Sequence, residues 1–354
     1  MPQNNQFNRV VLRVGNATTW NVTQLTLTNN SFRLIPEGFQ LNVAGDLTVG
    51  ANAHLGIKGS IACGGNLVLT NGARLSVFSG PAGANDSIYG AFVDVTNDIV
   101  IAEDAWLQPN SHPTDGGSVR LRMRNLRITG VNGGINAMGR GFAPRQGTGM
   151  GGGVTYYGGG GGYGGSGGTK NANVPGSTYG NPYAPLAPGS GGGGSAAGAP
   201  LFTGSGYGGG LISIEAAKDV FVKGLMIADG GIGASAYLYG AGGAGGGIFI
   251  SCDRFFGMET ALLSVKGGDC SHGGGGGGGR IAVWHRRMPA SLQAQLISGD
   301  TGTAISSTNN PADYLGQINV GIGIGSATRE LVDAQPGSIW FIMPPPSGTV
   351  FILR

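Results

Sequence analysis

The chain has few charged residues. Asp, Glu, Lys and Arg make up 11% of its 354 residues, whereas an ordinary soluble domain carries about 25%. The formal net charge of +3 is spread along the sequence without a run of Lys or Arg. No segment is therefore suited to neutralising a phosphate backbone, and we expect no nucleic-acid partner. Solubility must come from Asn, Ser, Thr and exposed backbone, which favours a location outside the cell.

Cysteine and long apolar runs are also scarce. Three cysteines, Cys63, Cys252 and Cys270, are too few for a disulfide scaffold and too widely spaced for a zinc ribbon. No run approaches the roughly 20 apolar residues of a membrane helix, so we expect no membrane span. Residues 1–7 lack the basic and apolar regions of a secretory signal. We expect either that a signal was removed or that the protein leaves its cell by lysis.

Glycine, by contrast, is abundant: the chain contains 74. Runs of glycine lead directly into short, apolar, β-branched segments that begin at Leu211, Ile248 and Arg280. A flexible linker would carry Ser, Gln or charge and no such segments. The glycine runs therefore mark the connections between predicted strands.

The first 110 residues contain an internal repeat with an offset of 20 residues, as from Asp46 to Asn66. Each copy predicts two short strands with alternating apolar residues around a turn. The copies are Asp46–Val49 with Ala53–Ile57, Asn66–Leu69 with Ala73–Val77, Asp98–Ile101 with Ala105–Leu107, and a degenerate Leu25–Leu27 with Phe32 and Leu34. A second style of repeat begins with Val119–Met123 and Arg124–Gly130, and its counterparts are Leu211–Ile214 with Lys218–Gly224 and Ile248–Ile250 with Asp253–Gly257.

A repeat of this length with short strands is typical of a solenoid, in which each coil buries its inner face against the next. The sequence therefore predicts an all-β protein, a right-handed parallel β-helix with glycine-rich excursions. We expect an N-terminal cap or assembly segment over residues 1–40, the β-helix over 41–290, and a C-terminal cap or assembly segment over 291–354.

The segment at about 139–210 is the longest glycine-rich excursion and has no strand pattern. Its composition allows disorder, an Ω-like loop, or extended glycine helices whose backbones pair closely because glycine has no Cβ. Tyrosines are interspersed and would clamp such layers. They are Tyr156, Tyr157, Tyr163, Tyr179, Tyr183 and Tyr207. Residues 240–247 and 273–279 are shorter excursions of the same kind.

These patterns carry two resemblances. The glycine runs before Ile248–Ile250 and Arg280–Val283 resemble the repeats of large bacterial cell-surface β-helix proteins, and the Asp46–Val49 type of coil is similar to those of β-helical adhesins and pectate-lyase-like proteins. The tyrosine-studded polyglycine resembles the receptor-binding adhesins at the tips of some phage tail fibres. That second resemblance implies binding of a host-surface glycan or protein, and a virion or cell-surface location.

Candidate ligand-binding residues come from two places. In Val119–Met123, arginines alternate with apolar residues, so Arg120, Arg122 and Arg124 are expected to project from one solvent face, with Arg127 close behind. They would bind an acidic polysaccharide or sulfate through bidentate contacts; a solvated basic face or a subunit contact are the alternatives. Tyr156, Tyr157 and Tyr163 are the second set of candidates for ligand binding.

Other reactive groups favour structural roles. Asp229, Asp253 and Asp269 are placed to gather calcium ligands, but Asx residues at turns commonly serve the turn itself. Cys252 and the Cys270–His272 segment are better explained by stacked thiols or a disulfide than by a metal site. The sequence therefore predicts no catalytic residue, no metal and no cofactor.

The leading functional hypothesis is a non-catalytic structural or adhesive surface protein of a phage appendage or an extracellular fibre. It would act by rigid display and multivalent contact, as a homo-oligomer or with other appendage subunits. The alternative is a polysaccharide lyase or hydrolase with a groove on a β-helix. Carboxylates lining a cleft together with Arg or Lys would favour the enzyme.

Overall fold

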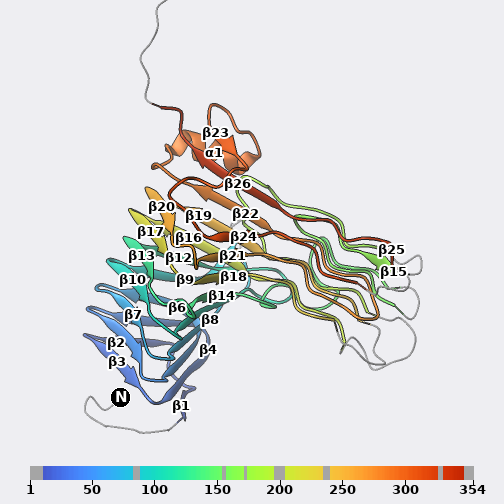
Figure 1. The fold of residues 1–354 in the computed structure, drawn as a ribbon. Coiled ribbons are helices and arrows are strands. Elements are labelled where there is room, and N and C mark those ends of the chain that lie inside the picture. Colours follow the sequence, from blue (N-terminus) through green and yellow to red (C-terminus); the bar gives the residue numbers. More distant parts are fainter. Residues whose placement is uncertain are drawn as a thin grey trace, which may run out of the picture.

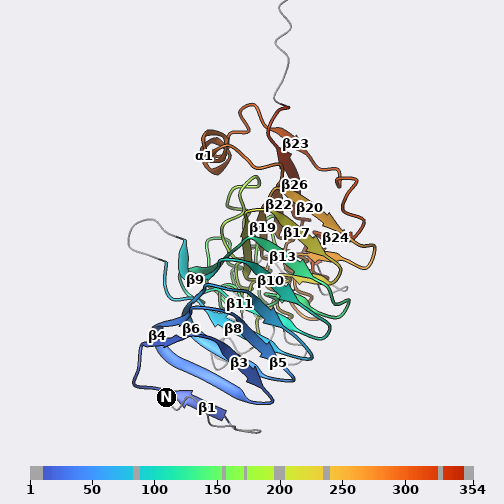
Figure 2. The same ribbon diagram turned by 90° about the vertical axis from the view of Figure 1, so that its left-hand side faces the viewer.

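The computed structural model describes residues 11–82, 88–153, 157–170, 174–194, 204–233, 240–325 and 330–346. The protein is predominantly β and its strands pair almost entirely in parallel (Figures 1 and 2). The strands stack from β1 near the N-terminus to β26 near the C-terminus. They form three continuous parallel ladders, which we name A, B and C.

Ladder A runs the length of the stack. Its strands are β2 (Thr19–Val22), the second half of β4 (Ser31–Val43), the second half of β6 (His54–Cys63), β9 (Tyr89–Val95), β12 (Ser118–Met123), β16 (Leu211–Ala216), β19 (Gly247–Ser251), β22 (Arg280–Trp284) and β26 (Ser338–Met343).

Ladder B shares β4 and β6 with ladder A, because these two strands run across both. Its strands are β1 (Val11–Val14), the first halves of β4 and β6, β8 (Arg74–Phe78), β11 (Trp106–Asn110), β14 (Gly134–Asn136), β18 (Leu225–Ile227), β21 (Leu262–Ser264) and β24 (Gln317–Asn319).

Ladder C is a separate seven-stranded sheet. Its strands are β3 (Leu25–Thr28), β5 (Leu47–Gly50), β7 (Leu67–Leu69), β10 (Asp98–Ile101), β13 (Asn125–Ile128), β17 (Asp219–Val222) and β20 (Arg254–Gly257).

The chain visits ladders B, A and C in turn, and the repeats seen in the sequence set the register. Leu47 pairs with Leu67, and Leu55 pairs with Leu75, which confirms the offset of 20 residues. The third copy and the degenerate copy of the first repeat also pair with their neighbours in the register of the sequence alignment. The copies of the second repeat do so as well, even across the insertion at 139–210. Because parallel pairing is in register, each position of the repeat forms a column of like residues.

The interior is a single aliphatic cluster to which all three ladders contribute. Leu75 of ladder B, Leu121 of ladder A and Leu126 of ladder C have no exposed side-chain surface. Strands whose inner faces are Val, Ile and Leu suit this packing because β-branched side chains fit a pleated surface. The core begins at Leu27, before the predicted boundary at residue 41, and reaches Phe341 in β26.

Four glycine-rich excursions leave the ladders at the same junction, where the chain would pass from ladder B to ladder A: β14 to β16, β18 to β19, β21 to β22 and β24 to β26. They run together to one side of the stack (Figure 1). Their backbones hydrogen-bond to one another, as from Gly268 N to Gly243 O (2.8 Å) and from Gly323 N to Gly276 O (2.8 Å). The described part of residues 139–210 takes part in this pairing, through Gly160 N and Gly168 O (2.8 Å), for example.

Glycine is required where these backbones meet. A Cβ built at Gly243 would overlap the carbonyl oxygen of Tyr207, and one at Gly276 would overlap that of Gly243. No side chain can be accommodated at such positions without separating the layers. The high glycine content is therefore a packing requirement of these excursions.

The remaining elements lie at the C-terminal end and at the end of the excursions. Helix α1 (Ala290–Ser298) packs on ladder A, and β23 (Ile305–Ser307) pairs antiparallel with β26, covering part of its free edge. Strands β15 (Thr169–Lys170) and β25 (Glu330–Val332) form a short antiparallel pair. Within the described residues, no helix has the length and apolar character needed to cross a membrane.

Replacing Gly243 by Ala is expected to lower the free energy of unfolding by about 1–3 kcal/mol, because the new methyl group must push the Tyr207 backbone aside. The matched control is Gly15→Ala, where a Cβ would meet no atom within 4 Å and little change is expected. Urea unfolding of both variants measures the difference. Equal effects of the two substitutions would contradict the close packing of the excursions.

Candidate functional site

The outer face of ladder A carries two neighbouring columns of side chains, because alternate residues of each strand point outward and the strands are in register. One column is Gln40, Ser60, Phe92, Arg120, Ser213, Phe249, Ala282 and Trp340. The other is Asn21, Asn42, Ala62, Asp94, Arg122, Glu215, Ser251, Trp284 and Ile342. The columns are polar toward the N-terminal end and apolar toward the C-terminal end.

The apolar end of the columns is covered. Trp284 is only 2% exposed, and it packs with Phe249 (ring centroids 4.8 Å apart, edge to face) beneath Leu292 and Leu296 of α1. The Trp284 indole N–H donates to the carbonyl oxygen of Tyr183 at 2.7 Å. This cover ends near Ser251, and from there the polar part of the face is open.

A hollow of about 680 Å³ lies at the edge of this cover. The Arg120 guanidinium lies over the Tyr89 and Phe92 rings, with its Cζ 5.5 and 5.6 Å from their centroids, and its Nε is 3.5 Å from Glu215 Oε1. The Tyr89 hydroxyl and Ser213 Oγ are 2.9 Å apart. Burial raises the pKa of Tyr89, so it stays a neutral hydrogen-bonding group.

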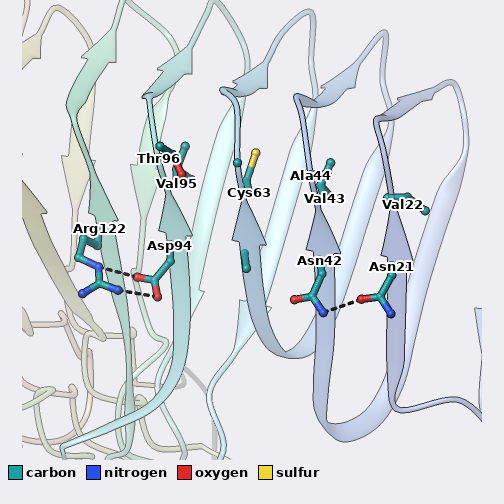
Figure 3. Close-up of a pocket in the computed structure, with 12 residues that line it drawn as sticks. Asn21, Val22, Asn42, Val43, Ala44, Cys63, Asp94, Val95, Thr96 and Arg122 are labelled. Carbon is teal, nitrogen blue, oxygen red and sulfur yellow. Dashed lines mark hydrogen bonds and ion pairs between the residues drawn. The ribbon is translucent and has the colours of Figure 1, made fainter.

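A second hollow, of about 510 Å³, continues from the first toward the N-terminal end, and Arg122 lines both (Figure 3). Arg122 makes a bidentate contact with Asp94, from Nε to Oδ1 (3.0 Å) and from Nη2 to Oδ2 (2.9 Å). Asn42 Nδ2 donates to Asn21 Oδ1 at 2.7 Å. Figure 3 shows these four side chains as two pairs along one line, with β6, which carries Ala62 at this position, between Asp94 and Asn42. We call the two hollows together the ladder A groove.

The ladder A groove combines planar polar groups with aromatic rings on a rigid sheet. Amide, guanidinium and carboxylate groups offer paired donors and acceptors, which suit adjacent hydroxyl groups. The aromatic rings supply apolar surface beside them. This combination is suited to binding a sugar chain along the face.

Two carboxylates in the groove flank Arg122. Asp94 and Glu215 occupy the strands on either side of it, so their backbones are two strand spacings apart, about 9–10 Å. Inverting glycosidases use two carboxyl groups about 6.5–9.5 Å apart, one of which must be protonated to act as an acid. Here each carboxylate is engaged in an ion pair, Asp94 with Arg122 at 2.9 Å and Glu215 with Arg120 at 3.5 Å.

The structure separates the predicted arginines. Only Arg120 and Arg122 share a strand face; Arg124 is exposed at the bend between β12 and β13, and Arg127 lies on ladder C, with its Nε 3.4 Å from Asp98 Oδ2. The expectation that three of them project from one face was wrong, because the chain turns into the next ladder at Arg124 and the alternation starts again there.

The tyrosine candidates also differ from one another. Tyr156 lies outside the described residues, and Tyr157 is partly buried. Tyr163 has no exposed surface: it packs against Tyr179 with ring centroids 4.8 Å apart, and the Arg280 guanidinium lies over its ring. Burial raises its pKa far above the usual range. Tyr163 therefore clamps the glycine layers from inside and does not reach the surface.

The other reactive groups serve the fold. Asp229 Oδ1 accepts hydrogen bonds from Ser264 Oγ (2.6 Å) and Lys266 N (2.7 Å), and Asp269 pairs with Lys266 Nζ (2.8 Å). The described residues contain no group of three or more His, Cys, Asp or Glu placed to hold a metal. Cys252 and Cys270 are both buried and no disulfide joins them, so the expected disulfide is wrong.

Sequence reasoning missed Tyr89, Phe92, Asp94 and Glu215. The sequence contains a signal for the outward position of Asp94, because the apolar residues Val93 and Val95 flank it as apolar residues flank Arg122. Glu215 pairs with Arg122 across the insertion at 139–210, so only the alignment of the second-style repeats points to it.

Searches against protein-family models, curated proteins and solved structures found no significant match to this chain. The account of its function therefore depends on the geometry of the chain itself.

Replacing Arg122 by Gln is expected to lower the free energy of unfolding by no more than about 1 kcal/mol, because exposed ion pairs contribute little. Trp284→Ala is expected to cost about 3–5 kcal/mol, because it leaves a cavity beneath α1 and an unpaired Tyr183 carbonyl. Urea unfolding compares them. A comparable loss in both variants would mean that the open end of the face is structural.

Proposed function

We propose that the protein is a non-catalytic adhesive surface protein that binds a host-surface glycan along the ladder A groove. The observation that carries this proposal is the column of planar polar side chains, Asn21 and Asn42 and then, beyond Ala62, Asp94, Arg122 and Glu215, beside Tyr89 and Phe92 on a sheet whose register fixes their spacing. Binding residues on strands lose little freedom when a ligand binds, so a rigid face is well suited to this role.

The architecture belongs to the same proposal. Three parallel ladders visited in turn support a right-handed parallel β-helix, and the mutually hydrogen-bonded excursions support extended glycine helices. A rigid rod of this kind with a low content of charge fits a phage virion appendage or an extracellular cell-surface fibre. Its end strands offer unpaired edges for a second copy or another appendage subunit.

A polysaccharide lyase or hydrolase is the second candidate, and the specific observation in its favour is the placement of Asp94 and Glu215 on either side of Arg122. Both carboxylates are engaged in ion pairs, Asp94 with Arg122 and Glu215 with Arg120, which weighs against either of them acting on a substrate. The adhesive function is therefore the better supported of the two.

The test is binding of the purified protein to host-cell envelopes and to isolated surface polysaccharides, with the release of reducing ends measured in the same samples. We expect binding without cleavage. Arg120→Ala removes the group that contacts both rings and Glu215, and is expected to weaken binding about tenfold or more. The matched control is Arg127→Ala on ladder C, for which no change is expected.

Two results would contradict the proposal. Equal binding by wild type and Arg120→Ala would place the ligand elsewhere. Release of reducing ends that is abolished by both Glu215→Gln and Asp94→Asn, but not by Asp98→Asn on ladder C, would establish the enzyme instead.

A further inference from the structure

A second polar surface lies on the outer face of ladder B, apart from the ladder A groove. In-register pairing puts His54, Arg74 and Trp106 in one column, on β6, β8 and β11 (Figure 2). Arg33 on β4 lies beside them: its Cγ is 4.0 Å from the position that a Cβ at Gly56 would occupy. Arg140, which follows β14, completes the group. We call these five side chains the basic patch.

Two members of the basic patch, His54 and Arg140, are hydrogen-bonded to polar side chains of β8 and β11. His54 Nε2 lies 3.0 Å from Ser76 Oγ, and Ser76 donates to Gln108 Oε1 at 2.9 Å. On the neighbouring position of β11, Asn110 Oδ1 accepts from Arg140 Nη1 at 2.6 Å. Ser76, Gln108 and Asn110 are all buried beneath the charged groups. The patch is thus built on an ordered polar layer.

The positive charge of this patch is not compensated. Within the described part of the chain, Arg33, Arg74 and Arg140 form no ion pair, whereas Arg120, Arg122, Arg127 and Arg254 all do. The pKa of His54 is lowered by burial and then by the charges of Arg33, Arg74 and Arg140, which shows how closely these cations gather. Arg140 Nε is buried without a hydrogen-bond partner.

We propose that the basic patch binds the anionic groups, carboxylate or sulfate, of an acidic polysaccharide. Three guanidinium groups without acidic partners create a local positive potential, and their planar forks match both anions. Trp106 adds an apolar surface beside Arg74 for a sugar ring.

That the ligand is a polysaccharide rests on the proposed glycan-binding function. That the ligand carries anionic groups is inferred from the residues of the basic patch alone. A single-stranded nucleic acid fits less well, because such sites combine a basic groove with several stacking aromatic rings. The patch has one aromatic side chain, Trp106. Nucleic acid is therefore an outcome of the test that would contradict the proposal.

The experiment measures the affinity of the full chain for chondroitin sulfate, hyaluronate, neutral dextran and poly-deoxythymidine at low and moderate salt. The first two probes separate sulfate from carboxylate. We expect one or both to bind, dextran not to bind at this patch, and affinity to fall with added salt. The double variant Arg33→Gln/Arg74→Gln is expected to weaken binding about tenfold or more.

The matched control is Arg127→Gln/Arg254→Gln, which removes the same charge from ladder C; its affinity should stay within about twofold of wild type. Arg140→Lys keeps the charge but removes the planar guanidinium fork, and should also weaken binding. The proposal is overturned if neither acidic polysaccharide binds, if the control loses as much affinity, or if poly-deoxythymidine binds as tightly. One further result would separate this inference from the proposed function. If the Arg33→Gln/Arg74→Gln variant binds cell envelopes as wild type does while Arg120→Ala loses binding, the proposed function stands and only this inference is refuted.

Discussion

In-register parallel pairing of the backbone is the constraint on which the rest of the structure depends. Each strand of a ladder hydrogen-bonds to the corresponding strand of the next repeat, so a residue at a given position of the repeat lies directly above its counterpart. Inward positions thereby become continuous aliphatic columns, such as Leu55, Leu75 and Leu107. Outward positions become rows of functional side chains. The ladder A groove and the basic patch are two of these rows.

The glycine excursions extend the same backbone pairing into regions that have no side-chain core. Every side chain at a position such as Gly243 or Gly276 would hold neighbouring backbones apart, so the layers form only where Cβ is absent. The few larger residues have defined places. Tyr163 and Tyr179 pack against each other and under Arg280, which ties the excursions to β22. The aliphatic interior of the ladders and the high glycine content of the excursions therefore both follow from how closely the paired backbones approach.

Much of this arrangement could be predicted from the sequence, because residues that align between copies of the repeat are the residues that pair between neighbouring strands. The alignment of Ala53–Ile57, Ala73–Val77 and Ala105–Leu107 already places His54, Arg74 and Trp106 in one column. What the repeat does not encode is where the chain turns: Arg124 follows the alternation of β12 but lies at a bend. The repeat also does not predict contacts between columns. The position of Arg120 over Tyr89 and Phe92 depends on side-chain directions. The approach of Arg140 to Asn110 depends on the length of the connection that follows β14.

One system of backbone hydrogen bonds orders both the ladders and the glycine excursions. Amide hydrogen exchange of the native protein, followed by mass spectrometry, compares the two regions. We expect peptides from residues 158–168, 189–193, 240–247 and 273–279 to exchange as slowly as peptides from β6, β12 and β16, because their N–H groups are buried and paired. Exchange of the glycine peptides at the rate of an unstructured chain, with the ladder strands still protected, would contradict it.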